Sequence, residues 1–122
     1  MATSTGHTSA ILASKVSGTS VYDTTGEKIG NIEDIVLDKT SNQILFAVVS
    51  FGGFLGIGEK YHSVPWSLLD YNKETGGYII PLSKDVLKAA PSYDLNDFTR
   101  GDGVSQIRDK SYDYYKVQKT WQ

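Results

Sequence analysis

The sequence predicts a mainly β protein, a small antiparallel β-barrel followed by a short helix and a C-terminal helix. Short apolar runs rich in Val, Ile, Thr, Tyr and Phe, which strands favour, follow one another over residues 20–82. Three clusters of turn-forming residues separate these runs, at 23–26, 38–42 and 72–77. Because helix signals come only after these runs, we expect the strands to form one unit before the helices begin.

Length and composition limit the classes of protein to which this chain can belong. With 122 residues it has room for one domain, and the absence of cysteine excludes disulfides, thiolate metal sites and a cysteine nucleophile. Its 12 basic and 14 acidic residues give a net charge of -2, so we expect no direct nucleic-acid binding. The longest apolar run, 44–49, falls well short of the roughly 20 residues that a membrane-spanning helix needs, so we expect no membrane insertion.

The N-terminal part of the chain predicts a tail followed by a hairpin. Residues 1–10 lack the basic start and the apolar stretch of a secretory signal, which favours a flexible tail and a cytoplasmic protein. In the first turn Asp23 can accept hydrogen bonds from the following backbone, and Gly26 can adopt a positive φ. The turns at 38–42 and 72–77 repeat this chemistry, so several antiparallel strands are expected.

The strand between the first two turns has no cleanly apolar face. Its inward-facing set changes from Ile32 to Ile35 and Leu37. A β-bulge at Glu33 and Asp34 would insert the one extra residue that this change requires. We therefore expect these two carboxylates to be structural rather than a pair for acid–base catalysis.

The later strands differ in how they are covered. The run 43–51 is apolar on both faces, which predicts a central strand covered on two sides. Pro65 lacks a backbone N–H, so it predicts a bend between strands at 60–64 and 67–71. A last strand is expected over 77–82.

Residues after the last strand predict two helices joined by a linker. Ser83 is a suitable N-cap for a short helix that ends before Pro91. Residues 92–103 are polar and predict an extended surface linker. Beyond them a C-terminal helix is expected, with an apolar stripe that Ser111 weakens. The stripe consists of Val104, Ile107, Tyr114 and Trp121.

The side chains that could carry chemistry do not form a recognisable site. The glycine-rich stretch 52–60 is not a phosphate-binding loop, because Glu59 separates the last glycine from Lys60. On a strand Glu59 and His62 would face opposite ways, so a metal site is not expected. No histidine is expected in the core, where it could serve as a catalytic base. The acidic run that begins at Asp94 lacks the glycine of a calcium loop. We expect no cofactor and no enzymatic activity.

Several motifs, in order and spacing, resemble the PRC-barrel family. They are Gly26-Glu27-Lys28-Ile29-Gly30, Ile32-Glu33-Asp34-Ile35-Val36-Leu37-Asp38, a glycine-rich loop over 52–60, and Val64-Pro65-Trp66. The resemblance covers residues 11–90, which we take as the PRC-barrel domain, followed by a linker and C-terminal helix over 91–122. It implies an antiparallel barrel that docks onto other proteins and that has no shared active site.

The resemblance implies a non-enzymatic docking or regulatory adaptor module, with other proteins or a second copy in a homodimer as partners. Relatives occur as the cytoplasmic part of the H subunit of photosynthetic reaction centres, as a domain of a ribosome maturation factor, and as free-standing proteins. This chain is similar to the free-standing members. A ribosome-associated assembly factor, an accessory subunit of a membrane electron-transfer complex and an unrecognised small-molecule enzyme remain as alternatives.

Apolar side chains in and beside the glycine-rich loop, and aromatic side chains near the C-terminus, are the candidate interface. A hairpin tip normally shows less apolar surface than this loop has, and aromatic residues are enriched at interfaces. The loop residues could instead fold back onto the barrel. The candidate residues are Phe51, Phe54, Leu55, Ile57, Tyr114 and Trp121.

Overall fold

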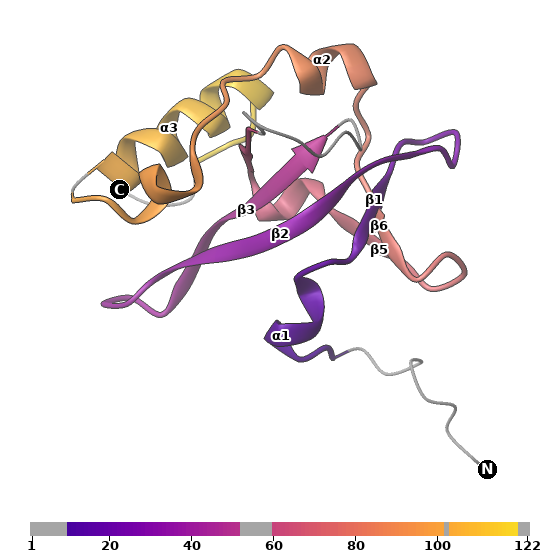
Figure 1. Ribbon diagram of the computed structural model, residues 1–122, viewed down its shortest axis with the longest axis horizontal. Helices are drawn as coiled ribbons and strands as arrows, with labels where there is room; N and C mark the ends of the chain where they lie inside the picture. The colour runs from indigo at the N-terminus through magenta and orange to yellow at the C-terminus, as the bar shows by residue number, and fades with distance from the viewer. Residues whose placement is uncertain (1–9, 52–59, 102, 120–122) are drawn as a thin grey trace.

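The computed structural model describes residues 10–51, 60–101 and 103–119, and its strands form one six-stranded sheet (Figure 1). The strands are β1 (Ser20–Tyr22), β2 (Lys28–Asp38), β3 (Gln43–Phe51), β4 (His62–Val64), β5 (Asp70–Asn72) and β6 (Gly77–Ile79). The helical segments are α1 (Ala13–Val16), η1 (Trp66–Leu68), α2 (Lys84–Lys88), η2 (Leu95–Thr99) and α3 (Gly103–Tyr115). The mainly β class, with helices after the last strand, is confirmed.

The topology of the sheet differs from the predicted antiparallel barrel. The strand order is β4-β3-β2-β1-β6-β5, and β1 and β6 run parallel while the other pairs are antiparallel. Local turns fix the direction of consecutive strands only, and β1 and β6 are not consecutive. No ladder joins β4 to β5 within the described ranges, so the sheet is not closed there. Both edge strands have three residues, and Pro65 directs the chain into η1 between them.

Each of the three predicted turns has a side-chain acceptor at its first residue. Asp23 Oδ1 accepts a hydrogen bond from the backbone N–H of Thr25 at 2.9 Å, and Asn72 Oδ1 accepts one from that of Thr75 at 3.0 Å. Asp38 does the same in the turn between β2 and β3. These contacts close the turns as the sequence predicts.

The predicted bulge is present in β2. Ile32 pairs with Val49 and Asp34 pairs with Val48, so Glu33 is the extra residue. The Glu33 carboxylate accepts a hydrogen bond from the hydroxyl of Ser50 at 2.7 Å. Its role is therefore structural, as the pattern of residues indicates.

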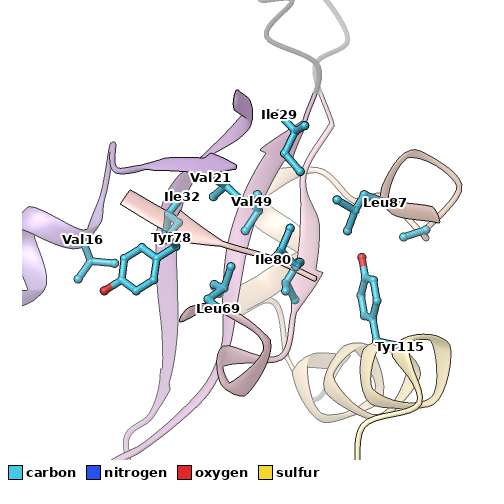
Figure 2. Packing of buried hydrophobic residues seen from close by; sticks show 13 residues of the cluster. Val16, Val21, Ile29, Ile32, Val49, Leu69, Tyr78, Ile80, Leu87 and Tyr115 are labelled. Carbon is cyan, nitrogen blue, oxygen red and sulfur yellow. The ribbon is translucent and has the colours of Figure 1, made fainter. Parts of the chain in front are cut away.

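Strand β3 separates two cores, which confirms that it is covered on both faces. The main core lies on one face (Figure 2) and consists of Val16, Val21, Ile29, Ile32, Ala47, Val49, Val64, Leu69, Tyr78, Ile80, Leu87, Ala90 and Tyr115. The second core lies on the other face and consists of Phe46, Val48, Phe98 and Ile107. The alternation of side chains along β3 sends successive residues to opposite cores.

The second core contains a residue from the stretch predicted as a polar linker, and that prediction is wrong. Residues 95–99 form η2, and Asp94 and Asp97 make a reciprocal capping box at its start. Phe98 is 2% exposed, with its ring centroid 5.7 Å from that of Phe46. The apolar second face of β3 requires cover, and η2 and α3 provide it.

Helix α3 is present as predicted but ends at Tyr115. Lys116 has a positive φ of 58°, and the N–H of Val117 donates to the carbonyl of Tyr112, which terminates the helix. The predicted apolar stripe therefore does not continue along the helix to residue 121. Ser111, which weakens that stripe, is buried, and its hydroxyl donates to a backbone carbonyl of β4 at 2.7 Å.

The short helix after the last strand is also confirmed. The Ser83 hydroxyl accepts a hydrogen bond from the N–H of Val86, as an N-cap does. The hydroxyl of Tyr114 donates to the carbonyl of Val86 at 2.7 Å. This contact links the C-terminal helix to α2.

Replacing Tyr115 by phenylalanine is expected to stabilise the protein by about 1 kcal/mol. The hydroxyl points toward Leu87 in the main core (Figure 2), and it has no hydrogen-bond partner among the described residues. Burial raises the pKa of this phenol above its ordinary value, with a smaller contribution from Tyr114. Urea denaturation should give a higher midpoint for the variant, and an unchanged or lower midpoint would contradict the prediction.

Candidate docking site

The structure describes two of the six predicted interface residues, and both are partly buried. Phe51 ends β3 and packs against the main core. Tyr114 also packs against that core and is held by its hydrogen bond to α2. Phe54, Leu55, Ile57 and Trp121 lie outside the described residues, so their assignment stays a prediction.

His62 is buried, against the expectation that no histidine would lie in the core. It is 8% exposed, its Nδ1 lies 3.0 Å from the carbonyl oxygen of Pro91, and its ring centroid lies 5.2 Å from that of Phe51. Burial lowers the pKa of the imidazole from 6.5, and the hydrogen bond to Pro91 opposes this effect in part. The side chain fills the space between β4, the end of β3 and the segment after α2.

The stability of the protein is expected to fall as the pH falls below 6.5, and His62→Gln is expected to reduce that fall. The folded state binds the imidazole proton less tightly than the unfolded state, whose pKa is close to 6.5. The stabilising effect is therefore complete above 6.5 and is lost as the pH falls through the lower pKa of the folded state. Denaturation midpoints at about pH 7.5 and about pH 5.5 measure the effect.

The aspartates with shifted pKa values do not contribute to the difference in stability between these two pH values. Hydrogen bonds lower the pKa values of Asp23, Asp38 and Asp94 from 3.8, so their contributions are lost at more acidic pH. Equal pH dependence in the wild-type protein and in His62→Gln would contradict the prediction.

Two further features were sought in the part of the chain that the structure describes, a cluster of metal-binding side chains and a membrane-spanning helix. No cluster of three or more His, Asp or Glu side chains is close enough to hold a metal within it. None of the helices in the same ranges is long and apolar enough to cross a membrane.

A groove runs between the second half of β2 and η2, and we call it the β2 groove. Its volume is about 530 Å³. Val48 and Phe98 of the second core contribute to its lining, while Leu37 and Leu95 are 54% and 51% exposed. The lining residues are Asp34, Ile35, Val36, Leu37, Lys39, Val48, Leu95, Asn96, Phe98 and Thr99.

The exposure of Leu37 contradicts the prediction that it faces inward. The register of β2 against β3 shifts a second time between Val36 and Leu37, and Leu45 is the extra residue on β3. In addition, β1 pairs only with residues 28–31, so the main core does not extend along this end of β2. Leu37 pairs with Ile44, which is 39% exposed, and the two form an apolar cross-strand pair at the end of the hairpin.

One edge of β2 beside the groove carries no strand. Contacts from the segment after α1 reach as far as Glu33, whose carbonyl accepts a hydrogen bond from the hydroxyl of Ser17 at 2.7 Å. Beyond it, no strand pairs with this edge over 34–38 within the described ranges. The N–H of Ile35 is instead bound by the Oδ1 of its neighbour Asp34 at 2.8 Å.

A second, smaller hollow of about 290 Å³ lies between η2 and α3. It is lined by Tyr93, Asp97, Arg100, Gly103, Gln106, Ile107 and Lys110. The carboxylate of Asp97 accepts a hydrogen bond from the N–H of Asp94 and forms an ion pair with Arg100 at 3.6 Å. The charged groups of Asp97 and Arg100 therefore contribute to the local structure of η2, and the β2 groove is the stronger candidate for a docking site.

The β2 groove could not be predicted from the residue pattern, because residues 92–103, which include η2, were expected to form a linker. The available signal was the pair of apolar residues Leu95 and Phe98 within a polar stretch. In a 3-10 helix a spacing of three residues places both side chains on the same side, and both line the groove, Phe98 buried and Leu95 51% exposed.

The family model of the PRC-barrel domain matches residues 9–87, and the chain therefore belongs to the PRC-barrel family. A search of the curated proteins found no match. The matched residues include every strand of the sheet, whereas η2 and α3 follow the matched region. The β2 groove thus has one wall from the family domain and one from the segment beyond it.

Proposed function

We propose that this protein is a non-enzymatic docking module that binds other proteins through the β2 groove. The observation that carries the proposal is an open apolar groove flanked by two half-exposed leucines, Leu37 and Leu95. Grouped apolar side chains on a surface mark interaction sites, because leaving them in water is unfavourable. The sheet and the second core hold both walls, so the groove is preformed and little ordering is needed on binding.

A docking role is compatible with each of the functions that the family resemblance implies. A ribosome-associated factor and an accessory subunit of an electron-transfer complex would both use such a docking surface, as would a homodimer. The net charge of -2 favours contact with protein over direct contact with nucleic acid.

A pair of charged substitutions in the groove tests the proposal. Tagged wild-type protein and the double variant Leu37→Asp, Leu95→Asp are incubated with lysate of the source organism, and captured proteins are quantified by mass spectrometry. Tyr71→Asp is the matched control, because Tyr71 is 46% exposed but lies on β5 at the far edge of the sheet.

We expect a set of proteins that the Tyr71→Asp control still captures to be at least tenfold less abundant in the capture by the groove variant. Urea denaturation of all three proteins establishes that each is folded. If wild type and groove variant capture the same proteins in the same amounts, the β2 groove is not the docking site.

A further inference from the structure

The geometry points to one class of occupant for the β2 groove, an extended polypeptide segment of a partner protein that adds to the free edge of β2 as an antiparallel strand. This inference rests on the proposed docking function and specifies how the partner is recognised. Backbone hydrogen bonds along the edge would supply binding, and alternate side chains entering the groove would supply specificity.

The edge of β2 that does not pair with β3 is available over residues 34–38. Figure 1 shows the β2–β3 hairpin extending well past α1, and β1 pairs with β2 only as far as Asn31. The segment before β1 covers the next residue, because the N–H of Gly18 donates to the carbonyl of Ile32 at 2.6 Å. The backbone from Asp34 to Asp38 is therefore open on this side within the described residues.

The second step is the direction and length of the added strand. β1 lies on the same edge of β2 and is antiparallel to it, and we assign the added strand the same direction because antiparallel pairs outnumber parallel ones. Residues 34–38 offer a pairing length of roughly 17 Å, which corresponds to a strand of ordinary length.

The third step is the chemistry of the groove along that edge. Apolar side chains form its middle, and the charged residues Asp34 and Lys39 stand toward its two ends, five positions apart on the chain. Neither charge has an ion-pair partner among the described residues. A complementary antiparallel segment has a basic residue opposite Asp34, apolar residues after it toward the other end, and an acidic residue near Lys39, which follows β2 in the turn.

Asp34 has a second role in this arrangement. Its carboxylate holds the N–H of Ile35 at 2.8 Å, which prevents that donor from pairing with any passing strand. A carbonyl of the bound segment would take over the N–H of Ile35. The carboxylate of Asp34 would then be released to pair with the basic side chain of the segment.

A second copy of this chain fits the edge less well. Two β2 edges paired antiparallel about Val36 would place Asp34 of each copy opposite Asp38 of the other. Like charges directly opposite one another destabilise a strand pair. This register of self-pairing is therefore disfavoured, and we assign the edge to a different protein.

The test uses synthetic peptides as probes. A library of octapeptides has a glutamate and, five positions later, a lysine, with all combinations of Val, Ile, Leu and Thr between them. Each peptide has a partner with the same sequence in which alternate backbone amides are N-methylated, so that backbone pairing is blocked while the side chains are kept. Binding to the full-length protein is measured by fluorescence anisotropy, and the exchange of its amide protons is followed by NMR.

We expect members of the library to bind at least tenfold more tightly than their N-methylated partners. Binding should weaken at least tenfold in Leu95→Asp and stay unchanged in Tyr71→Asp. The amide proton of Leu37 or its neighbours in 34–38 should exchange more slowly when the peptide is bound. Exchanging the glutamate and the lysine in a binding peptide should weaken it severalfold in the wild-type protein but not in the double variant Asp34→Ala, Lys39→Ala.

Two outcomes of the peptide experiment would overturn the inference. Either no library member binds better than its N-methylated partner, or binding leaves the amide exchange of 34–38 unchanged. If the lysate experiment still shows capture that depends on the groove, then docking stands and only strand addition fails. If both experiments are negative, then the proposed function fails as well. Dimerisation of the protein with slowed exchange at the same amides would instead identify a second copy as the occupant, and would also overturn the inference.

Discussion

Replacing Phe98 by alanine is expected to lower the free energy of unfolding by about 3–5 kcal/mol. The side chain is 2% exposed, and its ring packs against those of Phe46 and Tyr93 with centroid separations of 5.7 and 5.5 Å. Its removal leaves a cavity in the second core that the surrounding strands cannot close. Phe98 also anchors η2, so the same change is expected to weaken binding in the β2 groove.

Urea denaturation followed by circular dichroism measures the loss of stability. Leu95→Ala is the matched control, because Leu95 lies in the same short helix but is 51% exposed, and we expect a change within about 0.5 kcal/mol. If Phe98→Ala were as stable as this control, the segment after residue 91 would not be an integral part of the fold.

Replacing Gly30 by alanine is expected to destabilise the protein by about 3 kcal/mol. A Cβ atom at this position would overlap the backbone carbonyl oxygen of Ser50 on β3 and would lie 3.0 Å from the Cδ1 of Phe51. A backbone carbonyl held in a strand pair cannot move aside as a flexible side chain can. The β2–β3 pairing must therefore shift to accommodate the methyl group.

Gly103→Ala is the control for Gly30→Ala. A Cβ atom at Gly103 has no heavy atom within 4 Å, and the position is the first residue of α3, where alanine favours the helix. We expect this variant to be as stable as the wild type or slightly more stable. Thermal unfolding of the two variants side by side tests both expectations, and equal midpoints would contradict the steric argument for Gly30.

The burial of Phe98 shows that the stable unit extends beyond the region that matches the family. The match ends at residue 87, before η2 and α3. Without those elements Phe46 and Val48 of β3 would lie uncovered on one face of the sheet. A truncation after residue 91 should therefore expose this face and lower solubility along with stability.

The sequence by itself determined the features that depend on local chemistry. The acceptors Asp23 and Asn72 close their turns, and the Ser83 hydroxyl caps α2, because in each case the partner lies within four residues along the chain. The bulge at Glu33 was visible as a change in the apolar alternation, and Pro65 as a break between strands. Such interactions need no knowledge of how distant segments meet.

Only the tertiary structure decided which distant segments cover one another. The parallel pairing of β1 with β6, the burial of Phe98 and His62, and the exposure of Leu37 all depend on contacts between residues far apart in the sequence. A polar stretch that contains a single buried aromatic residue has the composition of a linker, and its environment is fixed only when the uncovered face of β3 is known. The β2 groove lies between β2 and η2, which are far apart in the sequence. For this reason the pattern of residues alone could not locate it.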